Sequence, residues 1–173
     1  MADLNTGGIA QRAQRLAEPL AAQLGLTLWD VRFLKEGALW YLRFWIDKPG
    51  GVTLDDCEAL SRMVDRPLDE ADFIAQAYTL EVCSPGIERE LTRDEHFAQY
   101  VGSLVTVKHQ GAGGKMIETV GALAGDKNKQ ITLRFKDGTE QTIARTKTTT
   151  VKLYDDFEED EIADEDLEDF EEE

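Results

Sequence analysis

The turn at Ser84, Pro85 and Gly86 constrains this chain most, because it stops an apolar segment near the middle of the sequence. The preceding residues, 77–84, alternate between apolar and polar as a strand does. Proline presets φ for the first central position of a type II turn, and glycine accepts the positive φ of the second. A charged run, 88–90, follows at once. We interpret the joint between two domains as Ser84, Pro85, Gly86, Glu88 and Arg89; a ligand site at the turn is the alternative.

Residues 1–91 predict an α/β domain with the order helix, strand, strand, helix, strand. Apolar residues recur at helical spacing over 8–24 and again over 53–72, where Thr53 is a plausible N-cap. Between the helices, 26–48 switches to a period of two and turns at Gly37. We expect both helices to cover one face of a three-stranded sheet. We also expect Pro19 and Pro67 to bend, restart or end the helices, and one sheet face to carry Trp29, Val31 and Phe33.

Residues 92–154 predict a second, all-β domain that follows a short helical turn. Five short strands fit the alternation, at 103–109, 115–125, 130–135, 140–145 and 150–154. Gly121 interrupts the second of them and suggests a bulge or a sharp bend. Five strands in so short a segment favour a small barrel, because closure removes exposed sheet edges. The whole fold class is therefore α+β.

Charge is distributed unevenly along the chain. Residues 155–173 hold 14 of the 35 acidic residues and no base, so we expect a disordered acidic tail. Residues 1–91 hold 15 acids and 9 bases, whereas 92–154 hold 6 acids and 10 bases. Such a division predicts different partners for the two domains. The tail either competes with RNA for the basic domain or only aids solubility.

The sequence contains no recognisable catalytic, cofactor or metal set, and we expect no enzymatic activity. His96 and His109 stand alone, and the two cysteines, Cys57 and Cys83, lie inside expected elements. The pair Asp55 and Asp56 fits a helix start, and the glycine-rich 111–115 lacks the spacing of a phosphate loop. No signal peptide or membrane-spanning segment is evident, so a cytoplasmic protein with reduced thiols is expected.

Two groups of residues are candidates for binding. Basic residues of the second domain suit RNA phosphates, although a solvated surface explains them equally well; we name Lys108, Lys115, Arg134, Lys136, Arg145 and Lys147. In the first domain, Arg32 and Arg43 lie beside Tyr41 and Trp45 on one strand face. Such a face can stack on unpaired bases, or it can pack against a helix or the second domain.

Several motifs resemble the bacterial ribosome maturation factor RimP family. They are WDVRFLKEG (29–37), LRFWIDKPGGVTLDDCEALSRMVD (42–65), LEVCSPGIEREL (80–91) and MIETVGALAG (116–125). The resemblance implies an N-terminal α/β domain followed by a C-terminal Sm-like small β-barrel. It also implies a non-enzymatic factor that binds the free small (30S) ribosomal subunit late in its maturation. Its partners would be ribosomal RNA and a small-subunit ribosomal protein, with no DNA and no membrane, and the protein would act as a monomer.

The sequence leads to two hypotheses for the function of the protein. The first is a maturation factor for the small ribosomal subunit. The second is a free-standing RNA- or protein-binding adaptor whose acidic tail recruits a basic partner.

Overall fold

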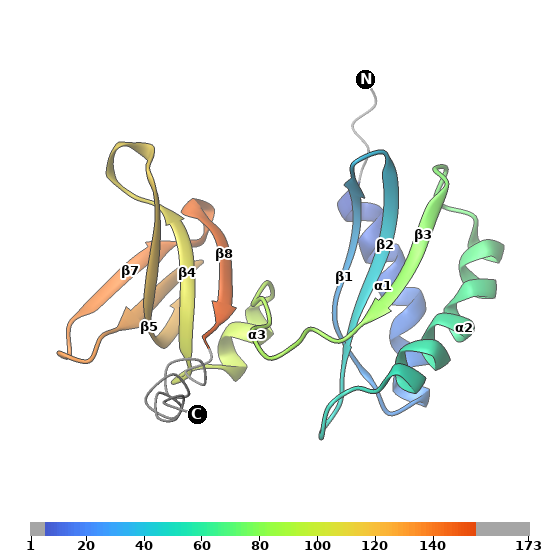
Figure 1. Ribbon diagram of the computed structural model, residues 1–173, viewed down its shortest axis with the longest axis horizontal. Helices are drawn as coiled ribbons and strands as arrows, with labels where there is room; N and C mark the ends of the chain where they lie inside the picture. The colour runs from blue at the N-terminus through green and yellow to red at the C-terminus, as the bar shows by residue number, and fades with distance from the viewer. Residues whose placement is uncertain (1–5, 155–173) are drawn as a thin grey trace, which may run out of the picture. The chain divides into compact units, whose positions relative to one another are not determined.

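A computed structural model describes residues 6–154, which contain three α-helices and two separate β-sheets (Figure 1). These residues divide into two compact units, with the boundary after Gly86. The mixed α/β class is confirmed. The tail predicted at 155–173 lies outside the described residues.

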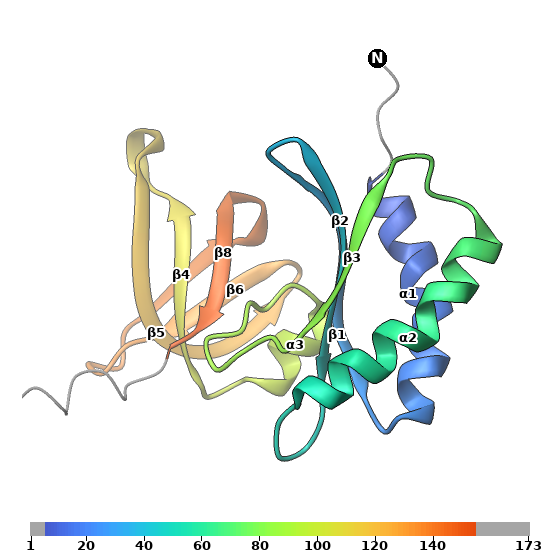
Figure 2. The same cartoon turned by 45° about the vertical axis from the view of Figure 1, so that its right-hand side comes forward.

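The first unit follows the predicted order of elements. Its elements are α1 (Thr6–Gln23), β1 (Thr27–Glu36), β2 (Leu39–Asp47), α2 (Leu54–Ala71) and β3 (Tyr78–Cys83). β1 and β2 form an antiparallel hairpin, and β3 pairs in parallel with β2. A parallel pair needs a long crossover connection, which α2 supplies. Both helices lie on the same side of the sheet (Figure 2).

Alternation along the strands builds the core of this unit. On β2, Leu42, Phe44 and Ile46 are fully buried, and they pack with α1 residues such as Ala17 and α2 residues such as Leu60. Burying side chains of this size gains roughly 1.5–3 kcal/mol each relative to leaving them in water. The hydrophobic period in the sequence therefore identifies the packed face correctly.

The second helix begins as predicted and runs through Pro67 to Ala71. The Thr53 side chain accepts a hydrogen bond from the Asp56 amide, and the Asp56 carboxylate accepts one from the Thr53 amide. This reciprocal capping box satisfies two amides that a helix start leaves without partners. Pro67 lies inside α2 and does not end it. Leu68 just beyond the proline is buried, so core packing holds the last turn in place.

The expectation that Trp29 shares a face with Val31 and Phe33 was wrong. The pairing of β1 with β2 shifts by one residue between Leu28 and Asp30, which makes Trp29 the extra residue of a β-bulge. Trp29 is buried, but it does not belong to the core cluster beneath the helices.

The second unit contains the five predicted strands. Its elements are α3 (Asp94–Gln99), β4 (Leu104–Gln110), a 3-10 turn (Ala112–Gly114), β5 (Met116–Lys127), β6 (Gln130–Arg134), β7 (Glu140–Ala144), a second 3-10 turn (Arg145–Lys147) and β8 (Thr148–Leu153). They form one antiparallel sheet in the order β7-β6-β5-β4-β8. Each strand contributes at least one buried apolar residue, as Val107, Leu123, Ile131, Ile143 and Val151 show. β7 and β8 lie at the two edges of the sheet, so the ladders do not confirm a closed barrel.

The predicted irregularity in β5 lies a few residues from where the sequence suggests it. Gly121 pairs regularly with Val105, and the register shift falls between Leu123 and Gly125. Gly121 has another role, because a Cβ atom there would lie 3.2 Å from the Cβ of Leu133. That is closer than side chains normally pack, so glycine lets the two strands approach.

The joint is shorter than the sequence suggests. Gly86 has a φ of 78°, as the predicted type II turn requires, and its amide donates to the Ser84 hydroxyl. The following residues already pair with β8: the Leu91 amide donates to the Val151 carbonyl at 2.8 Å, and the Arg89 carbonyl accepts from Leu153. The charged run 88–90 therefore lies within the second unit, and the boundary falls after 86 rather than after 91.

Candidate functional site

The face of the first sheet opposite the helices gathers charged and aromatic side chains. The strand register aligns Arg32, Arg43 and Glu81 across β1, β2 and β3. Tyr41 and Trp45 occupy the same face two residues to either side of Arg43 on β2. We call this surface the helix-free face, and it comprises Asp30, Arg32, Glu36, Tyr41, Arg43, Trp45 and Glu81.

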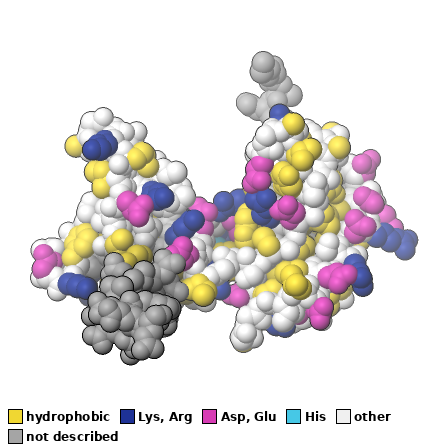
Figure 3. All heavy atoms as spheres, in the orientation of Figure 1, with side chains coloured by type: hydrophobic (Ala, Val, Ile, Leu, Met, Phe, Trp, Pro, Cys, Tyr) yellow, Lys and Arg dark blue, Asp and Glu magenta, His cyan; other side chains and the backbone are white. Residues whose placement is uncertain are grey.

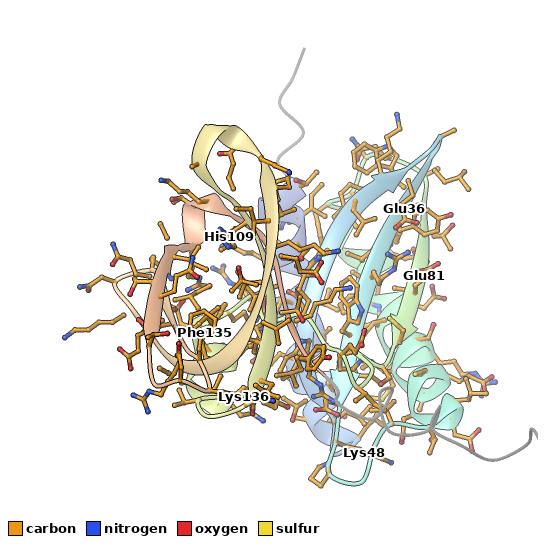
Figure 4. All side chains as sticks on the ribbon, turned by 60° about the vertical axis from the view of Figure 1, so that its left-hand side comes forward. Glu36, Lys48, Glu81, His109, Phe135 and Lys136 are labelled. Atoms are coloured by element: carbon orange, nitrogen blue, oxygen red, sulfur yellow. The ribbon has the colours of Figure 1, made fainter. Side chains whose placement is uncertain are left out.

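Arg43 is the centre of the helix-free face. Its Nε donates to Glu81 at 2.6 Å, and its Nη1 donates to Glu36 at 3.0 Å. These hydrogen bonds raise the pKa of Arg43 above its ordinary value, and the bond that Arg43 donates to Glu36 is the larger cause. Figure 4 shows Glu36 and Glu81 on the first sheet. The guanidinium also lies over the Tyr41 ring, 5.4 Å from its centroid.

Arg32 is held in the same way. Its Nε donates to Asp30 at 2.9 Å, and its guanidinium lies 5.1 Å from the centroid of Trp45. Arg43 lies 5.7 Å from that same centroid, so both guanidinium groups contact one indole. The sequence thus predicts this cluster of arginines and aromatic rings correctly.

The carboxylates change what the face can bind. Three of them, on Asp30, Glu36 and Glu81, surround the two arginines and leave a net charge of −1. A phosphate approaching Arg43 would meet two carboxylates that already hold its guanidinium. The electrostatics therefore favour a cationic group, as basic proteins carry, over a nucleic-acid backbone.

The predicted basic residues of the second unit separate into two groups. Three are engaged in ion pairs: Lys108 with Glu118 at 3.4 Å, Arg134 with Glu140 at 2.8 Å, and Arg145. The others are Lys115, Lys136 and Lys147, which are exposed and form no ion pair with any residue of 6–154. In the view of Figure 3, acidic and basic side chains are interspersed on the surface of both units.

The Arg145 side chain is mostly buried in the second unit and forms its hydrogen bonds there. Its Nη1 donates to Asp126 at 2.8 Å and to Asp94 at 2.6 Å, and its Nη2 donates to the Thr92 carbonyl at 3.0 Å. The guanidinium lies 4.3 Å from the centroid of Phe97 on α3. Arg145 and Lys129 together lower the pKa of Asp94, with the hydrogen bond from Lys129 the larger cause. This arrangement fastens α3 to the strands.

The first unit matches a known protein family. Residues 16–88 match the model of the RimP N-terminal domain. The first unit is therefore similar to the RimP N-terminal domain. The match runs from within α1 to just beyond Gly86, so it coincides with the first compact unit. It confirms the resemblance that the sequence motifs indicate, and the family is one of ribosome maturation factors.

The RimP N-terminal domain and the unit after it differ in charge. Up to Gly86 the chain has 13 acidic and 8 basic residues, a net charge of −5. Residues 87–154 have 8 acidic and 11 basic residues, a net charge of +3. The revised boundary therefore preserves the asymmetry that the sequence indicates.

The two histidines form hydrogen bonds within the fold, and the two cysteine thiols are partly buried. His96 is buried, and its Nδ1 accepts hydrogen bonds from the amides of Thr92 and Arg93 at the start of α3. His109 lies on β4 (Figure 4), with its Nε2 2.9 Å from the Thr119 hydroxyl. Burial raises the pKa of both thiols, which disfavours the nucleophilic thiolate.

Two absences apply to residues 6–154. No group of three or more acidic, histidine or cysteine side chains is placed to hold a metal ion. No helix in this range combines the length and hydropathy that crossing a membrane requires.

Sequence reasoning missed the partners of the candidate residues. Glu36 and Glu81 were not singled out, although they decide the charge of the helix-free face. Phe135 and Tyr154 were also not named, yet they line a hollow in the second unit together with Lys136. The alternation of the strands gave a signal for Glu81, since Leu80 and Val82 point to the core and so Glu81 faces away from it.

Proposed function

We propose that this protein is a maturation factor for the small (30S) ribosomal subunit that binds the free subunit without catalysing a reaction. The RimP N-terminal domain supports the ribosomal role. The charge asymmetry supports two kinds of contact: a basic ribosomal protein at the first unit and ribosomal RNA at the second. The helix-free face carries the first of these, because its carboxylates outnumber its arginines.

The mechanism is a shift of populations. A protein that binds one conformation of an immature subunit more tightly stabilises it by the difference in binding free energy. A tenfold preference corresponds to about 1.4 kcal/mol at 25 °C. Such a factor needs no catalytic group, and it leaves when the mature conformation no longer offers the bound surface.

Several finer features belong to this proposal. The five-stranded order, the bulge in β5 and the buried apolar residue on each strand support an Sm-like small barrel for the second unit. A monomer in the cytoplasm fits a factor that meets subunits one at a time. The basic residues Lys108, Lys115, Arg134, Lys136, Arg145 and Lys147 remain proposed RNA contacts, and the three lysines without an ion pair in residues 6–154 are the most available.

Sedimentation tests the proposal. A cell extract is run on a sucrose gradient, and the protein is followed by immunoblot across the free-subunit, ribosome and soluble fractions. We expect the protein in the small-subunit fractions, and we expect a deletion strain to accumulate immature small subunits. Absence from those fractions together with normal subunit levels in the deletion strain would refute the proposal.

A charge-reversal pair sharpens the assignment of the first unit. Glu81→Lys makes the helix-free face positive and should reduce small-subunit binding, whereas Glu70→Lys reverses an exposed charge on α2 and should leave it unchanged. Equal binding of both variants would remove the helix-free face from the proposal.

The acidic tail favours a second candidate, the adaptor. Fourteen carboxylates in the last 19 residues are an attractive surface for a basic partner. A pull-down with residues 155–173 alone distinguishes the two functions. Enrichment of non-ribosomal proteins by this segment would favour the adaptor.

A further inference from the structure

A hollow of about 420 Å³ opens in the second unit where β5 runs past the end of β6. The ladder between these strands stops at Ala122 and Arg134, while β5 extends back to Met116. The walls include the half-buried side chains of Phe135 and Tyr154. We call it the Phe135–Tyr154 hollow.

The walls of the hollow are positioned by the backbone. The Phe135 ring packs close to Gly121, because a Cβ atom at Gly121 would lie only 3.4 Å from the Phe135 Cε1. The Phe135 amide donates to the Thr139 carbonyl at 2.9 Å and so anchors the start of the turn. The Tyr154 amide donates to the Leu104 carbonyl at 3.0 Å, which holds this residue beside β4.

The rim of the hollow carries two cationic side chains, of which one is paired with a carboxylate of residues 6–154 and the other is not. Arg134 donates twice to Glu140, through Nε at 3.0 Å and Nη2 at 2.8 Å. Lys136 is exposed and has no ion pair within 6–154. The nearby carboxylate of Asp137 is turned to the amide and hydroxyl of Thr139 instead. Figure 4 shows Phe135 and Lys136 toward the lower end of the second unit, in its turn from β6 to β7.

We propose that the Phe135–Tyr154 hollow binds one unpaired RNA nucleotide. The base lies against the rings of Phe135 and Tyr154, and the ammonium of Lys136 contacts its phosphate. Unpaired bases stack on aromatic side chains irrespective of sequence, and the hollow has the volume of a small-ligand site. This site rests on the proposed function and specifies the form of RNA, single-stranded rather than duplex, that the second unit recognises.

A nucleotide suits the hollow better than a peptide. A peptide needs an aromatic residue beside an acidic one to satisfy both the rings and the cation, whereas a nucleotide offers a flat π-face and an anion within one residue. The rest of the unit adds to the attraction, because residues 87–154 carry a net charge of +3.

Binding of labelled RNA oligonucleotides to the full-length protein tests the site. The probes are a fluorescein-labelled uridine hexamer and a labelled RNA duplex, each followed by fluorescence anisotropy over a range of salt. The variants are Phe135→Leu, Tyr154→Leu and Lys136→Gln. Lys35→Gln, which removes an exposed charge from the first unit, is the matched control. Circular dichroism melts establish that each variant folds.

The two kinds of variant should fail in different ways. Phe135→Leu and Tyr154→Leu should each weaken hexamer binding about tenfold or more, because stacking of one base contributes roughly 1–3 kcal/mol. Their salt dependence should stay unchanged. Lys136→Gln should lower the slope of log K against log salt by about 0.7, the value for one phosphate contact on a single strand. Duplex binding should not respond to either aromatic substitution.

A crosslinking readout keeps the test independent of folding defects. A hexamer with 4-thiouridine is irradiated with the wild-type protein, and the attached peptide is identified by mass spectrometry. Crosslinks at Phe135 or Tyr154 support the site; crosslinks confined to other residues overturn it. Tighter hexamer binding by both aromatic variants also overturns it, since another segment, such as 155–173, would then occupy the hollow.

These outcomes separate the site from the proposed function. If the protein sediments with small subunits but Phe135→Leu and Tyr154→Leu bind the hexamer like wild type, only the hollow is refuted. If the aromatic variants lose hexamer binding, but the wild-type protein never sediments with subunits and the deletion strain has normal subunit levels, the ribosomal function is refuted and the nucleotide site stands. A wild-type protein that binds no hexamer overturns the site.

Discussion

Replacing Arg145 with leucine should destabilise the second unit strongly. The Arg145 side chain is 16% exposed, and that of its partner Asp126 is 7% exposed. Leucine fills part of the space but leaves the Asp126 carboxylate buried without its cation. The hydrogen bond to the Thr92 carbonyl and the contact with the Phe97 ring are lost as well.

The magnitude follows from the burial of the pair. Removing one partner of a buried ion pair costs about 3–5 kcal/mol. Because Arg145 keeps some exposure, we expect the lower end, about 3 kcal/mol. For a unit of this size, 1 kcal/mol shifts the melting temperature by about 4–8 °C, so the expected fall is about 12–24 °C. Arg145→Lys should cost less, because it keeps the charge but cannot donate in the same fork geometry.

The positions of the tryptophans make the assay selective. All three, Trp29, Trp40 and Trp45, belong to the first unit. Denaturant unfolding followed by tryptophan fluorescence therefore reports on the first unit, whereas far-ultraviolet circular dichroism reports on both. We expect Arg145→Leu to shift the dichroism transition and leave the fluorescence transition in place.

Two results would refute this reasoning. A loss below about 1 kcal/mol would mean that water compensates the Asp126 carboxylate as well as Arg145 does. A double variant, Arg145→Leu with Asp126→Asn, should recover part of the stability because it removes the stranded charge. If the double variant is less stable than Arg145→Leu alone, the cost arises from lost packing instead.

Three further outcomes are expected. Gly121→Ala should destabilise the second unit by about 1–3 kcal/mol in a dichroism melt, since its Cβ would crowd β6, whereas Gly125→Ala, with no atom within 4 Å, is the control. The hydrogen bond from Lys48, followed by that from the amide at the helix cap, lowers the pKa of Asp56 to about 2. This carboxylate therefore stabilises the fold above its unfolded pKa of about 3.9, and the contribution disappears as the pH falls through about 2. Denaturant titrations of Asp56→Asn between pH 5 and about 2 should show a weaker dependence than wild type; an equal dependence would contradict the assignment. Truncation after Tyr154 should raise affinity for unrelated RNA at low salt, and equal binding would leave the tail a solubility device.

The elements of the first unit could be predicted because their signals are local. The apolar period of 53–72 and the cap at Thr53 lie within a few residues of what they determine. The same holds for the turn at Gly37, where a positive φ closes the hairpin. By contrast, the bulge at Trp29 depends on how β1 registers against β2, and the alternation of β1 alone does not contain that information.

The arginines and aromatic residues of the candidate site could be predicted from the sequence, but the carboxylates that pair with the arginines could not. Arg32 and Arg43 stand beside aromatic residues in the sequence, so their common face follows from alternation. The partner Glu81, however, lies 38 residues from Arg43 and meets it only through the parallel pairing of β2 and β3. Similarly, Arg145 reaches the Thr92 carbonyl across 53 residues. Long-range ion pairs of this kind need the topology before they can be inferred.

The difference between arginine and lysine in this protein has a physical consequence for RNA binding. Most of the arginines that the sequence singles out hold carboxylates within their own unit: Arg32, Arg43, Arg134 and Arg145. A phosphate would have to displace those carboxylates. This is costly because the planar guanidinium forms strong, charge-assisted hydrogen bonds with a carboxylate. Lys115, Lys136 and Lys147 form no ion pair within residues 6–154, so no carboxylate of that range has to be displaced from them. In the RNA binding that we propose, electrostatic attraction to the second unit rests on these exposed lysines and should decline steeply with salt. We therefore expect RNA binding that survives at high salt to come from the apolar walls of the Phe135–Tyr154 hollow.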